Sequence, residues 1–425
     1  MAGRGWIQLA YKSMFDCKLK DKTVFLRVDI NSSVVEGRVV ISSRIREHAK
    51  TIYALSEEGA KVVVLSHQGR PGEEEFIGLK RHADHIKKFI GRPVRFVKWD
   101  EDYVSIIKAM KDGEVVLMDN TRFQKEEQED KTPEEHAKDD FIMKLAPLGQ
   151  LFVQDALSVC HRPHATVVGF RPSMECVAGP VLKKELDALE KLEKIPKGKL
   201  VVLGGAKLSD SVSILRGMLD SGMCNKACIG GLFGELFLKA KGVDFGAKEK
   251  LFAEKKFDKM LPDAKRILEK YPSRIILPVD LAVAVQNGNG DSNGAAKFNA
   301  ACPPKAKRKE IKVQELPCQF ITMDIGTETT EIFKKEIRAS EVVVFNGPMG
   351  VYEQPKFSIG TKKILEAIAF HRCFSIIGGG DTERALTSFG LVPQDFGHVS
   401  LAGKALLQYL SAEPLPGLKI LEKKK

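Results

Sequence analysis

The chain alternates short apolar runs with longer segments of helical spacing, and this alternation restricts the fold more than any other feature. The first series of runs reads KTVFLRVD, KVVVLS, PVRFV, EVVLM and QLFVQD, with helical stretches such as residues 43–58 and 79–90 between them. A second series begins after Pro196 with KLVVLGG, NKACIGG, SRIILPVD, EVVVFNGP and CFSIIGGG. Strands separated by helices predict parallel sheets covered by helices on both faces. We therefore expect an α/β protein with two doubly wound, Rossmann-like parallel-sheet domains.

Two domains also fit the length of the chain, because 425 residues with 43% hydrophobic content exceed what one core usually organises. Residues 181–195 place four leucines on one helical face, and Pro180 and Pro196 flank this segment. We interpret the segment as a rigid interdomain helix. The predicted division is an N-terminal domain at 1–178, an interdomain helix at 179–196, a C-terminal domain at 197–400, and a segment at 401–425 that returns toward the first domain.

The formal net charge of +11 raises the question of nucleic-acid binding, with AKRKEIK at 306–312 and the terminal LEKKK as the obvious basic runs. Aromatic residues are only 7% of the chain, few for base stacking, so we expect solvated basic runs and no nucleic-acid partner. Residues 286–312, glycine-rich and then basic, read as a surface insertion. We find no apolar run near the ~20 residues of a membrane helix, no signal peptide and no CxxC pair among eight cysteines. These features predict a cytoplasmic protein without a membrane partner, disulfide framework or zinc site.

Before about residue 175, the loops that follow the apolar runs carry arginine, histidine and polar side chains. They read RVDIN, SHQGRPG, DNTRF and CHRPH. Because ligands bind at the carboxyl ends of parallel strands, and arginine suits carboxylate and phosphate, this half is predicted to hold a compact anion. The candidate residues are Asp29, Asn31, Arg44, His67, Arg70, Arg122 and Arg162. A single arginine of this kind is more often a surface ion pair, and His161 and His164 read first as structural histidines.

After that point the loops are rich in glycine, as in LGGAK, IGG, FNGPMG and IIGGGD. Glycine at a strand-to-helix junction lets backbone N–H groups approach phosphates, whereas one such pair alone is more often a tight turn. Lys207 follows the first pair directly, and Asp381 follows the last as either a helix N-cap or a magnesium ligand. The chain has neither GxxxxGK[ST] nor a GxGxxG opening the first strand–helix unit, which argues against a P-loop enzyme or a nicotinamide dehydrogenase.

The order and spacing of these motifs resemble phosphoglycerate kinase through nearly the whole chain, and most closely its archaeal branch. The motifs are RVDIN, SRIR, SHQGRPG, NTRF, DAxxxxHRxH, GGAK, PVDLAV, MDIG, NGPMGVYE and IIGGGDT. The resemblance implies reversible phosphoryl transfer between 1,3-bisphosphoglycerate and ADP, giving 3-phosphoglycerate and ATP, in glycolysis and gluconeogenesis. It also implies two facing domains that close during turnover, with phosphoglycerate on the first and Mg-ATP or Mg-ADP on the second. We expect a monomer.

The resemblance assigns a role to each candidate residue. Arg44 would reach the transferred phosphoryl group, Lys207 would touch the phosphates, and Asp381 would meet Mg²⁺. Phosphoglycerate contacts fall on Asp29, Asn31, Arg44, His67, Arg70, Arg122 and Arg162. Nucleotide contacts fall on Gly205, Lys207, Gly230, Gly231, Gly326, Asn346, Pro348, Glu353, Gly379, Gly380 and Thr382, with Glu353 taking the ribose hydroxyls.

Three departures from the family pattern bear on activity. Ser211 stands where many members have a second lysine, and Leu232 where many have a third glycine. SLAGKA at 400–405 replaces a STGGGA run whose glycine amides are expected to face the transferred phosphate. We hypothesise that Lys404 restores a charge there. Two hypotheses follow: an active kinase, and a related protein that binds these ligands without efficient transfer. A basic nucleic-acid module is a third reading.

Overall fold

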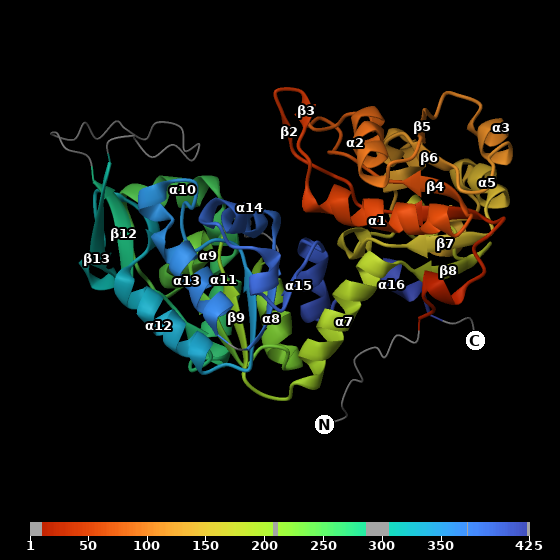
Figure 1. Cartoon of the computed structure of the whole chain (residues 1–425). Helices are drawn as coiled ribbons and strands as arrows, with labels where there is room; N and C mark the ends of the chain where they lie inside the picture. The colour runs from red at the N-terminus through yellow and green to blue at the C-terminus, as the bar shows by residue number, and fades with distance from the viewer. Residues whose placement is uncertain (1–10, 207–210, 286–305, 372, 423–425) are drawn as a thin grey trace. The chain divides into compact units, whose positions relative to one another are not determined.

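The computed structural model describes residues 11–206, 211–285, 306–371 and 373–422. These residues form two compact units (Figure 1). Within these ranges, unit 1 comprises residues 11–189, 404–406 and 414–422, and unit 2 comprises the described residues between 190 and 403 together with 407–413. Each unit contains one parallel sheet with helices around it, which confirms the predicted fold class.

Unit 1 is built on a six-stranded parallel sheet in the order β5-β6-β4-β1-β7-β8. Its strands are β1 (Thr23–Arg27), β4 (Lys61–Leu65), β5 (Val94–Val97), β6 (Val115–Met118), β7 (Leu151–Gln154) and β8 (Glu175–Ala178). Its helices are α1 (Ser43–Glu57), α2 (Lys80–Ile90), α3 (Tyr103–Lys108), α4 (Pro133–His136), α5 (Asp140–Leu145) and α6 (Ala165–Val168), and β2 (Val34–Val35) and β3 (Arg38–Val39) form a small hairpin. Successive β1 residues pack on opposite faces, because Val24 and Leu26 join the α1 and α2 core whereas Phe25 stacks on Phe170. A strand buried on both faces explains the unbroken apolar runs of the sequence.

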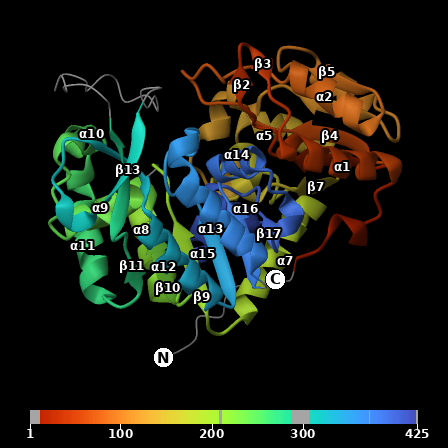
Figure 2. The same ribbon diagram turned by 60° about the vertical axis from the view of Figure 1, so that its left-hand side comes forward.

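Unit 2 repeats the arrangement in the order β11-β10-β9-β15-β16-β17, also all parallel. Figure 2 labels four of these strands, β9, β10, β11 and β17. The strands of this unit are β9 (Lys199–Leu203), β10 (Lys226–Ile229), β11 (Ile275–Ile276), β15 (Val342–Asn346), β16 (Phe374–Gly378) and β17 (His398–Val399). Its helices are α8 (Ser211–Ser221), α9 (Gly231–Ala240), α10 (Glu249–Glu254), α11 (Leu261–Lys270), α12 (Thr327–Arg338), α13 (Ile359–Phe370) and α14 (Gly380–Phe389). In both sheets the strand order reverses beside the first strand, at β1/β7 and at β9/β15. Such reversal points are where open α/β sheets bind ligands.

A second sheet in unit 2 was not predicted. Three antiparallel strands lie in the order β13-β12-β14, namely β12 (Asp280–Val285), β13 (Lys307–Lys312) and β14 (Ile321–Ile325). The predicted surface insertion at 286–312 is therefore wrong for its last part, since the basic run forms the edge strand β13, while residues 286–305 lie outside the described residues. The predicted single strand SRIILPVD also divides, with β11 in the parallel sheet and β12 starting at Asp280.

The predicted interdomain helix is α7 (Pro180–Lys194), which begins in unit 1 and ends in unit 2. Leu182, Leu186, Leu189 and Leu192 of its apolar face are buried. Near the C-terminus, α15 (Lys404–Leu410) has residues in both units and α16 (Pro416–Lys419) belongs to unit 1. No helix in the described ranges combines the length and apolarity that crossing a membrane requires.

Candidate active site

The predicted anion-binding residues of unit 1 gather at the carboxyl edge of its sheet. Asp29 and Asn31 follow β1, His67 and Arg70 follow β4, Arg122 follows β6, and Arg162 follows β7. Arg44 lies in the first turn of α1, where the Ser42 hydroxyl caps the helix by accepting from the Ile45 N–H. Parallel strands place all these loops at one edge of the sheet. The candidate residues from Asp29 to Arg162, which span 134 positions of the sequence, therefore gather there.

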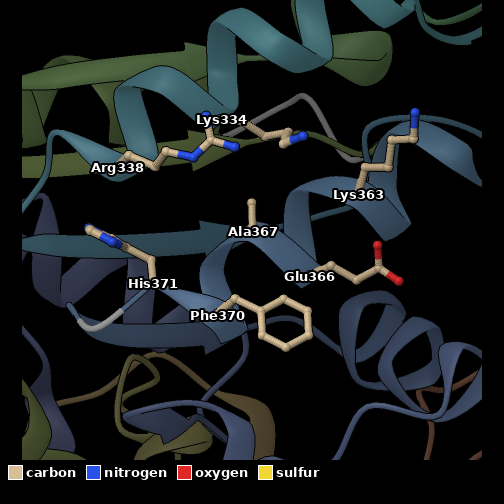
Figure 3. A pocket seen from close by; sticks show the side chains of 7 residues that line it. All are labelled: Lys334, Arg338, Lys363, Glu366, Ala367, Phe370 and His371. Carbon is tan, nitrogen blue, oxygen red and sulfur yellow. The ribbon is translucent and has the colours of Figure 1, made fainter.

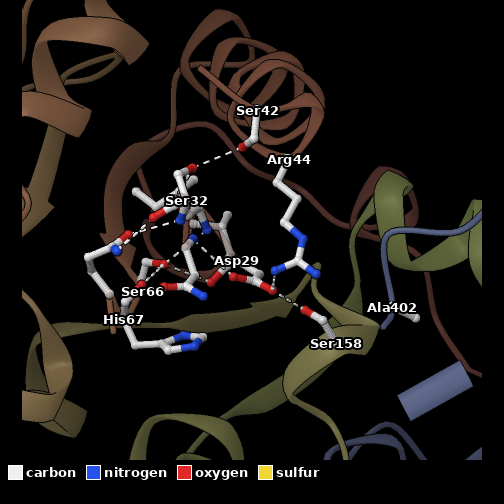
Figure 4. Close-up of polar contacts among 12 residues, drawn as sticks. Asp29, Ser32, Ser42, Arg44, Ser66, His67, Ser158 and Ala402 are labelled. Atoms are coloured by element: carbon white, nitrogen blue, oxygen red, sulfur yellow. Dashed lines mark hydrogen bonds and ion pairs between the residues drawn. The ribbon is translucent and has the colours of Figure 1, made fainter. Parts of the chain in front are cut away.

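Asp29 organises this edge, as Figure 4 shows. Its Oδ2 accepts hydrogen bonds from Arg44 Nη1 at 2.8 Å and from Ser158 Oγ at 2.5 Å, and its Oδ1 accepts from the Asn31 N–H at 3.0 Å. Asn31 Oδ1 in turn accepts from the Gly69 N–H at 2.9 Å. Burial opposes ionisation of Asp29, yet Arg44, His67 and Ser158 hold its pKa well below the usual range. The carboxylate is therefore charged and fixes the Arg44 guanidinium.

Two buried arginines lie beneath this edge. Arg27, 1% exposed, donates from Nη1 to the carbonyls of Val28 and Leu65 and lies 3.7 Å from the buried carboxylate of Glu127. Arg122 donates from Nη1 to the Gly69 carbonyl. Within the described residues, neither Arg27 Nε nor Arg122 Nε has a hydrogen-bond partner. Buried donors without acceptors cost free energy, so these two N–H groups mark the edge as electropositive and short of acceptors.

We call the five arginines at this edge, with the histidines packed among them, the cationic cluster: Arg27, Arg44, Arg70, Arg122 and Arg162, with His67, His161 and His164. Burial and neighbouring arginines lower the pKa of Arg122, Arg162 and the three histidines. Burial, Arg162 and Arg27 lower the pKa of Arg122 to about 10 and that of His164 to about 3, and burial and Arg162 lower the pKa of His161 to about 4. Burial also lowers the pKa of His67 well below its usual value. Burial is the largest cause of each shift, and the neighbouring arginines add to it. Several guanidinium groups therefore lie close together, an arrangement that favours an anion.

In unit 2, the predicted glycine loops meet at the carboxyl edge of the parallel sheet. The Gly205 N–H donates to the Pro348 carbonyl at 2.7 Å, which joins the loop after β9 to the loop after β15. Gly231 opens α9 with a φ of +58°, and a Cβ there would lie 2.8 Å from the Pro348 oxygen and 3.0 Å from the Gly205 nitrogen. Three backbone segments therefore approach within contact distance at the β9/β15 reversal point. Asn346 is the last residue of β15, and Gly230 is the N-cap of α9.

Some of the predicted nucleotide residues have structural partners that account for them. A Cβ on Gly326 would lie 2.2 Å from the Asp280 carboxylate, which caps α12 by accepting from the Glu328 and Thr329 N–H groups. The buried Thr382 Oγ1 accepts from the Gly347 N–H at 3.0 Å. These two residues shape the loops whether or not a ligand touches them. Glu353 is exposed, in the loop after β15.

The last glycine loop begins α14. Gly379 is its N-cap, so the interpretation of Asp381 as the N-cap is wrong: Asp381 is the second residue of the helix. Its side chain is 37% exposed and forms an ion pair with Arg384 one turn on. A Cβ on Gly380 would meet nothing within 4 Å, so open space adjoins this helix start. Lys207 lies outside the described residues.

The family assignment rests on whole-chain comparisons. A family model for phosphoglycerate kinase matches residues 14–413. This chain belongs to the phosphoglycerate kinase family. The curated phosphoglycerate kinase from Methanopyrus kandleri is 36% identical over 411 residues, which cover 96% of this chain and 96% of that relative. The one from Archaeoglobus fulgidus is 37% identical over 410 residues, which cover 96% of this chain and 95% of that relative. The crystal structure of phosphoglycerate kinase from Pyrococcus horikoshii OT3 is similar, with a TM-score of 0.86, 32% identity, and coverage of 96% of this chain and 98% of that one. The structure of phosphoglycerate kinase from Coxiella burnetii is also similar, with a TM-score of 0.74 and 31% identity. The match covers 97% of this chain and 98% of that one.

The departure from the phosphoglycerate kinase pattern at 400–405 has a structural consequence. The Ala402 N–H donates to Ser400 Oγ at 3.1 Å and Ala402 is 1% exposed, so this amide is already occupied. Gly403, with a φ of +56°, is the N-cap of α15, which begins at Lys404. Ser211 is the first residue of α8.

Sequence reasoning missed Ser158 and Glu127, and it counted Arg27 only as part of the RVDIN motif. Ser158 carried no signal, because a serine in a loop is common. Glu127 could have been found only through its buried partners, of which Thr121 is near in sequence but Thr166 is 39 positions away.

A surface pocket of about 400 Å³ lies elsewhere in the phosphoglycerate kinase fold, on the outer faces of α12 and α13 (Figure 3). It is lined by Lys334, Arg338, Lys363, Glu366, Ala367, Phe370 and His371. It contains no predicted site residue. Among described residues, no group of three or more histidine, cysteine or acidic side chains could hold a metal ion.

Proposed function

We propose that this chain is an active phosphoglycerate kinase, which transfers a phosphoryl group reversibly between 1,3-bisphosphoglycerate and ADP in glycolysis and gluconeogenesis. The observation that carries the proposal is the cationic cluster, in which five arginines gather at one edge of unit 1 beside the carboxylates of Asp29 and Glu127. Phosphoglycerate brings a carboxylate and a phosphate, and guanidinium groups bind both in a planar, bidentate manner.

The chemistry explains why the site offers no general base. The attacking carboxylate of 3-phosphoglycerate is already ionised at neutral pH, so no proton has to be removed. Buried histidines with pKa values near 3 and 4 are neutral at that pH and donate or accept hydrogen bonds only. The remaining tasks are to align two polyanions and to offset the charge of the phosphoryl oxygens. Arg44 is suited to the second task because Asp29 holds its guanidinium in one orientation.

The residues of unit 2 fit a magnesium nucleotide. Gly380 opens α14 beside open space, where the helix start favours negative charge. Asp381 offers one partly exposed carboxylate, and Mg²⁺ is commonly held by one or two carboxylates together with nucleotide phosphates. When bound, Mg²⁺ would offset phosphate charge. We assign phosphate contacts to Gly205, Lys207, Gly230, Gly231, Gly379 and Gly380, and nucleoside contacts to Gly326, Asn346, Pro348, Glu353 and Thr382.

Water competes for an activated phosphoryl group, so we infer that transfer occurs only after the two ligands are brought together by closure. We further propose that the protein acts as a monomer, since one chain carries both sets of residues. A cytoplasmic location fits its free cysteines, because every described cysteine is a thiol.

A coupled assay with 3-phosphoglycerate and Mg-ATP tests the proposal. The wild-type protein is expected to convert both substrates. R44M is expected to lose most of kcat, because Asp29 holds the Arg44 guanidinium at the carboxyl edge of the sheet, where phosphoglycerate is proposed to bind. R46M is the matched control, because Arg46 lies two residues further along α1 and stacks on Phe89 instead. Binding of both ligands without turnover would favour the related non-transferring protein.

A further inference from the structure

The basic run AKRKEIK contains one arginine whose environment differs from that of its neighbours. Lys307, Lys309 and Lys312 of β13 are exposed, whereas the Arg308 side chain is only 13% exposed. Arg308 therefore is not a solvated surface charge, which is how the sequence pattern was interpreted. Its guanidinium turns toward the loops of unit 2 that follow β14 and β15.

Every N–H group of the Arg308 guanidinium has an acceptor. Nη1 donates to Asp324 Oδ2 at 2.8 Å and to the Lys356 carbonyl at 3.0 Å. Nη2 donates to the Ile325 carbonyl at 3.0 Å and to Glu310 Oε1 at 2.8 Å, and Nε donates to the same Glu310 oxygen at 3.2 Å. One side chain thus joins three segments: its own strand, the end of β14, and the turn η9 (Pro355–Phe357) that follows the Glu353 loop.

The contacts on the β14 side hold the turn that contains Gly326. Arg308 donates to Asp324 and to the Ile325 carbonyl, which lie on the N-terminal side of this turn. Glu310, held by Arg308, accepts from the Thr327 N–H at 3.0 Å and the Thr327 hydroxyl at 3.1 Å, on the C-terminal side of the turn. The turn is therefore fixed on both sides of Gly326.

The contacts on the β15 side hold the loop that contains Glu353. Besides the bond from Arg308 to the Lys356 carbonyl, Lys356 Nζ donates back to the Ala306 carbonyl at 2.8 Å. The Asp324 carboxylate also accepts from the Gly360 N–H at 2.9 Å, and a Cβ on Gly350 would lie only 2.4 Å from its Oδ1. The loop from Gly350 to Gly360 is thus packed against the Arg308–Asp324 pair at both ends.

We propose that Arg308 is a positioning residue for the nucleotide, which fixes the Gly326 turn and the Glu353 loop in one relative geometry and so sets the affinity for the nucleoside part of ATP and ADP. This inference rests on the proposed function. It assigns Arg308 no contact with the ligand, since its N–H groups are all used within the protein. The planar fork matters because an ammonium group has three donors on a single nitrogen, and these cannot replace five N–H groups on three nitrogens that reach four acceptor atoms.

The test compares R308Q with K309Q, which removes one charge from the same strand at an exposed position. R308Q is expected to raise the KM for Mg-ATP and Mg-ADP about tenfold, as loss of several charge-assisted hydrogen bonds from two loops would do. The KM of R308Q for phosphoglycerate is expected to stay within about twofold of wild type, because the proposed phosphoglycerate ligands lie in unit 1. The KM values of K309Q for nucleotide and phosphoglycerate are expected to stay within the same range. R308K is expected to resemble R308Q. Unchanged nucleotide KM in R308Q, or full rescue by R308K, would overturn the proposal.

A double variant separates positioning from simple charge neutralisation. R308Q leaves Asp324 buried without its cation, which can lower stability by itself. R308Q/D324N removes that unpaired charge, so it is expected to recover thermal stability but to keep the weakened nucleotide binding. Recovery of wild-type nucleotide affinity in the double variant would show that Arg308 only neutralises Asp324. Calorimetric titration of the full chain with Mg-ADP gives the affinity independently of turnover, so a failure of the proposed activity is distinguishable from a failure of this inference.

Discussion

The hydrogen bond from Ser158 to Asp29 gives a quantitative test of how Arg44 is held. Ser158→Ala deletes the hydroxyl that lies 2.5 Å from Asp29 Oδ2 and leaves the Arg44 ion pair on the same oxygen. A hydrogen bond to a charged, buried acceptor contributes about 1.5–3 kcal/mol. Since Arg44 still offsets the charge, we expect the free energy of unfolding of S158A to fall by about 1.5 kcal/mol at pH 7.

Ser173→Ala is the matched control, because Ser173 Oγ donates to the neutral Phe170 carbonyl at 3.1 Å in the same unit. It is expected to cost about 1 kcal/mol or less and to leave catalysis unchanged. S158A, in contrast, loosens the carboxylate that orients Arg44, so the KM for phosphoglycerate is expected to rise several-fold. Urea unfolding and steady-state kinetics measure the two effects. Equal destabilisation of S158A and S173A with an unchanged phosphoglycerate KM would refute the role given to Asp29.

The pH dependence of the same pair follows from linkage. The pKa of Asp29 is lowered in the folded protein, so its stabilisation is present above the unfolded-state pKa near 3.9 and is lost as pH falls below it. Ser158 contributes to that lowering, so the stability difference between wild type and S158A is expected to be constant from pH 7 to about pH 5. A difference that disappears within that range would contradict the assignment of a charged Asp29.

Three further predictions concern the remaining loops. T382V removes the acceptor for the Gly347 N–H, so it is expected to lower the free energy of unfolding by about 1–2 kcal/mol and to raise the nucleotide KM. T382S keeps the hydroxyl and is expected to keep both values. Equal behaviour of the two variants would exclude this role for Thr382. K404A is expected to lower kcat about tenfold because the Ala402 amide is occupied by Ser400, and undiminished turnover would remove the compensation hypothesis. His161 and His164, with pKa values lowered to about 4 and 3, are expected to gain protons when an anion offsets the neighbouring arginines, so phosphoglycerate binding near pH 5.5 should take up protons. Calorimetry in buffers of different ionisation enthalpy measures that uptake, and buffer-independent heats would contradict it.

The parallel sheets could be predicted because their strands are buried on both faces and therefore leave unbroken apolar runs. The antiparallel sheet could not, because β13 is an edge strand with mostly exposed charged side chains, a pattern shared with solvated loops. Its identity depends on pairing with β12, from which the segment at 286–305 separates it in sequence.

The same distinction applies to the candidate site. Arginines and glycines that follow apolar runs could be found, because strand ends converge whatever the details of packing. Ser158, Glu127 and Arg308 could not, since each acts through hydrogen bonds to residues 16 to 129 positions away in sequence. Asp381 is the second residue of α14 and not its N-cap, because the helix begins two residues earlier than expected, with Gly379 in the N-cap position.

We propose that the cations of unit 1 and the backbone loops of unit 2 act on one phosphoryl group during turnover. The most direct test is ATP formation by the full-length wild-type protein from 1,3-bisphosphoglycerate and Mg-ADP, measured beside R44M. We predict rapid ATP formation that requires both substrates and is largely lost in R44M. Wild-type protein that binds both substrates but forms no ATP, or R44M that forms it at the wild-type rate, would contradict the account.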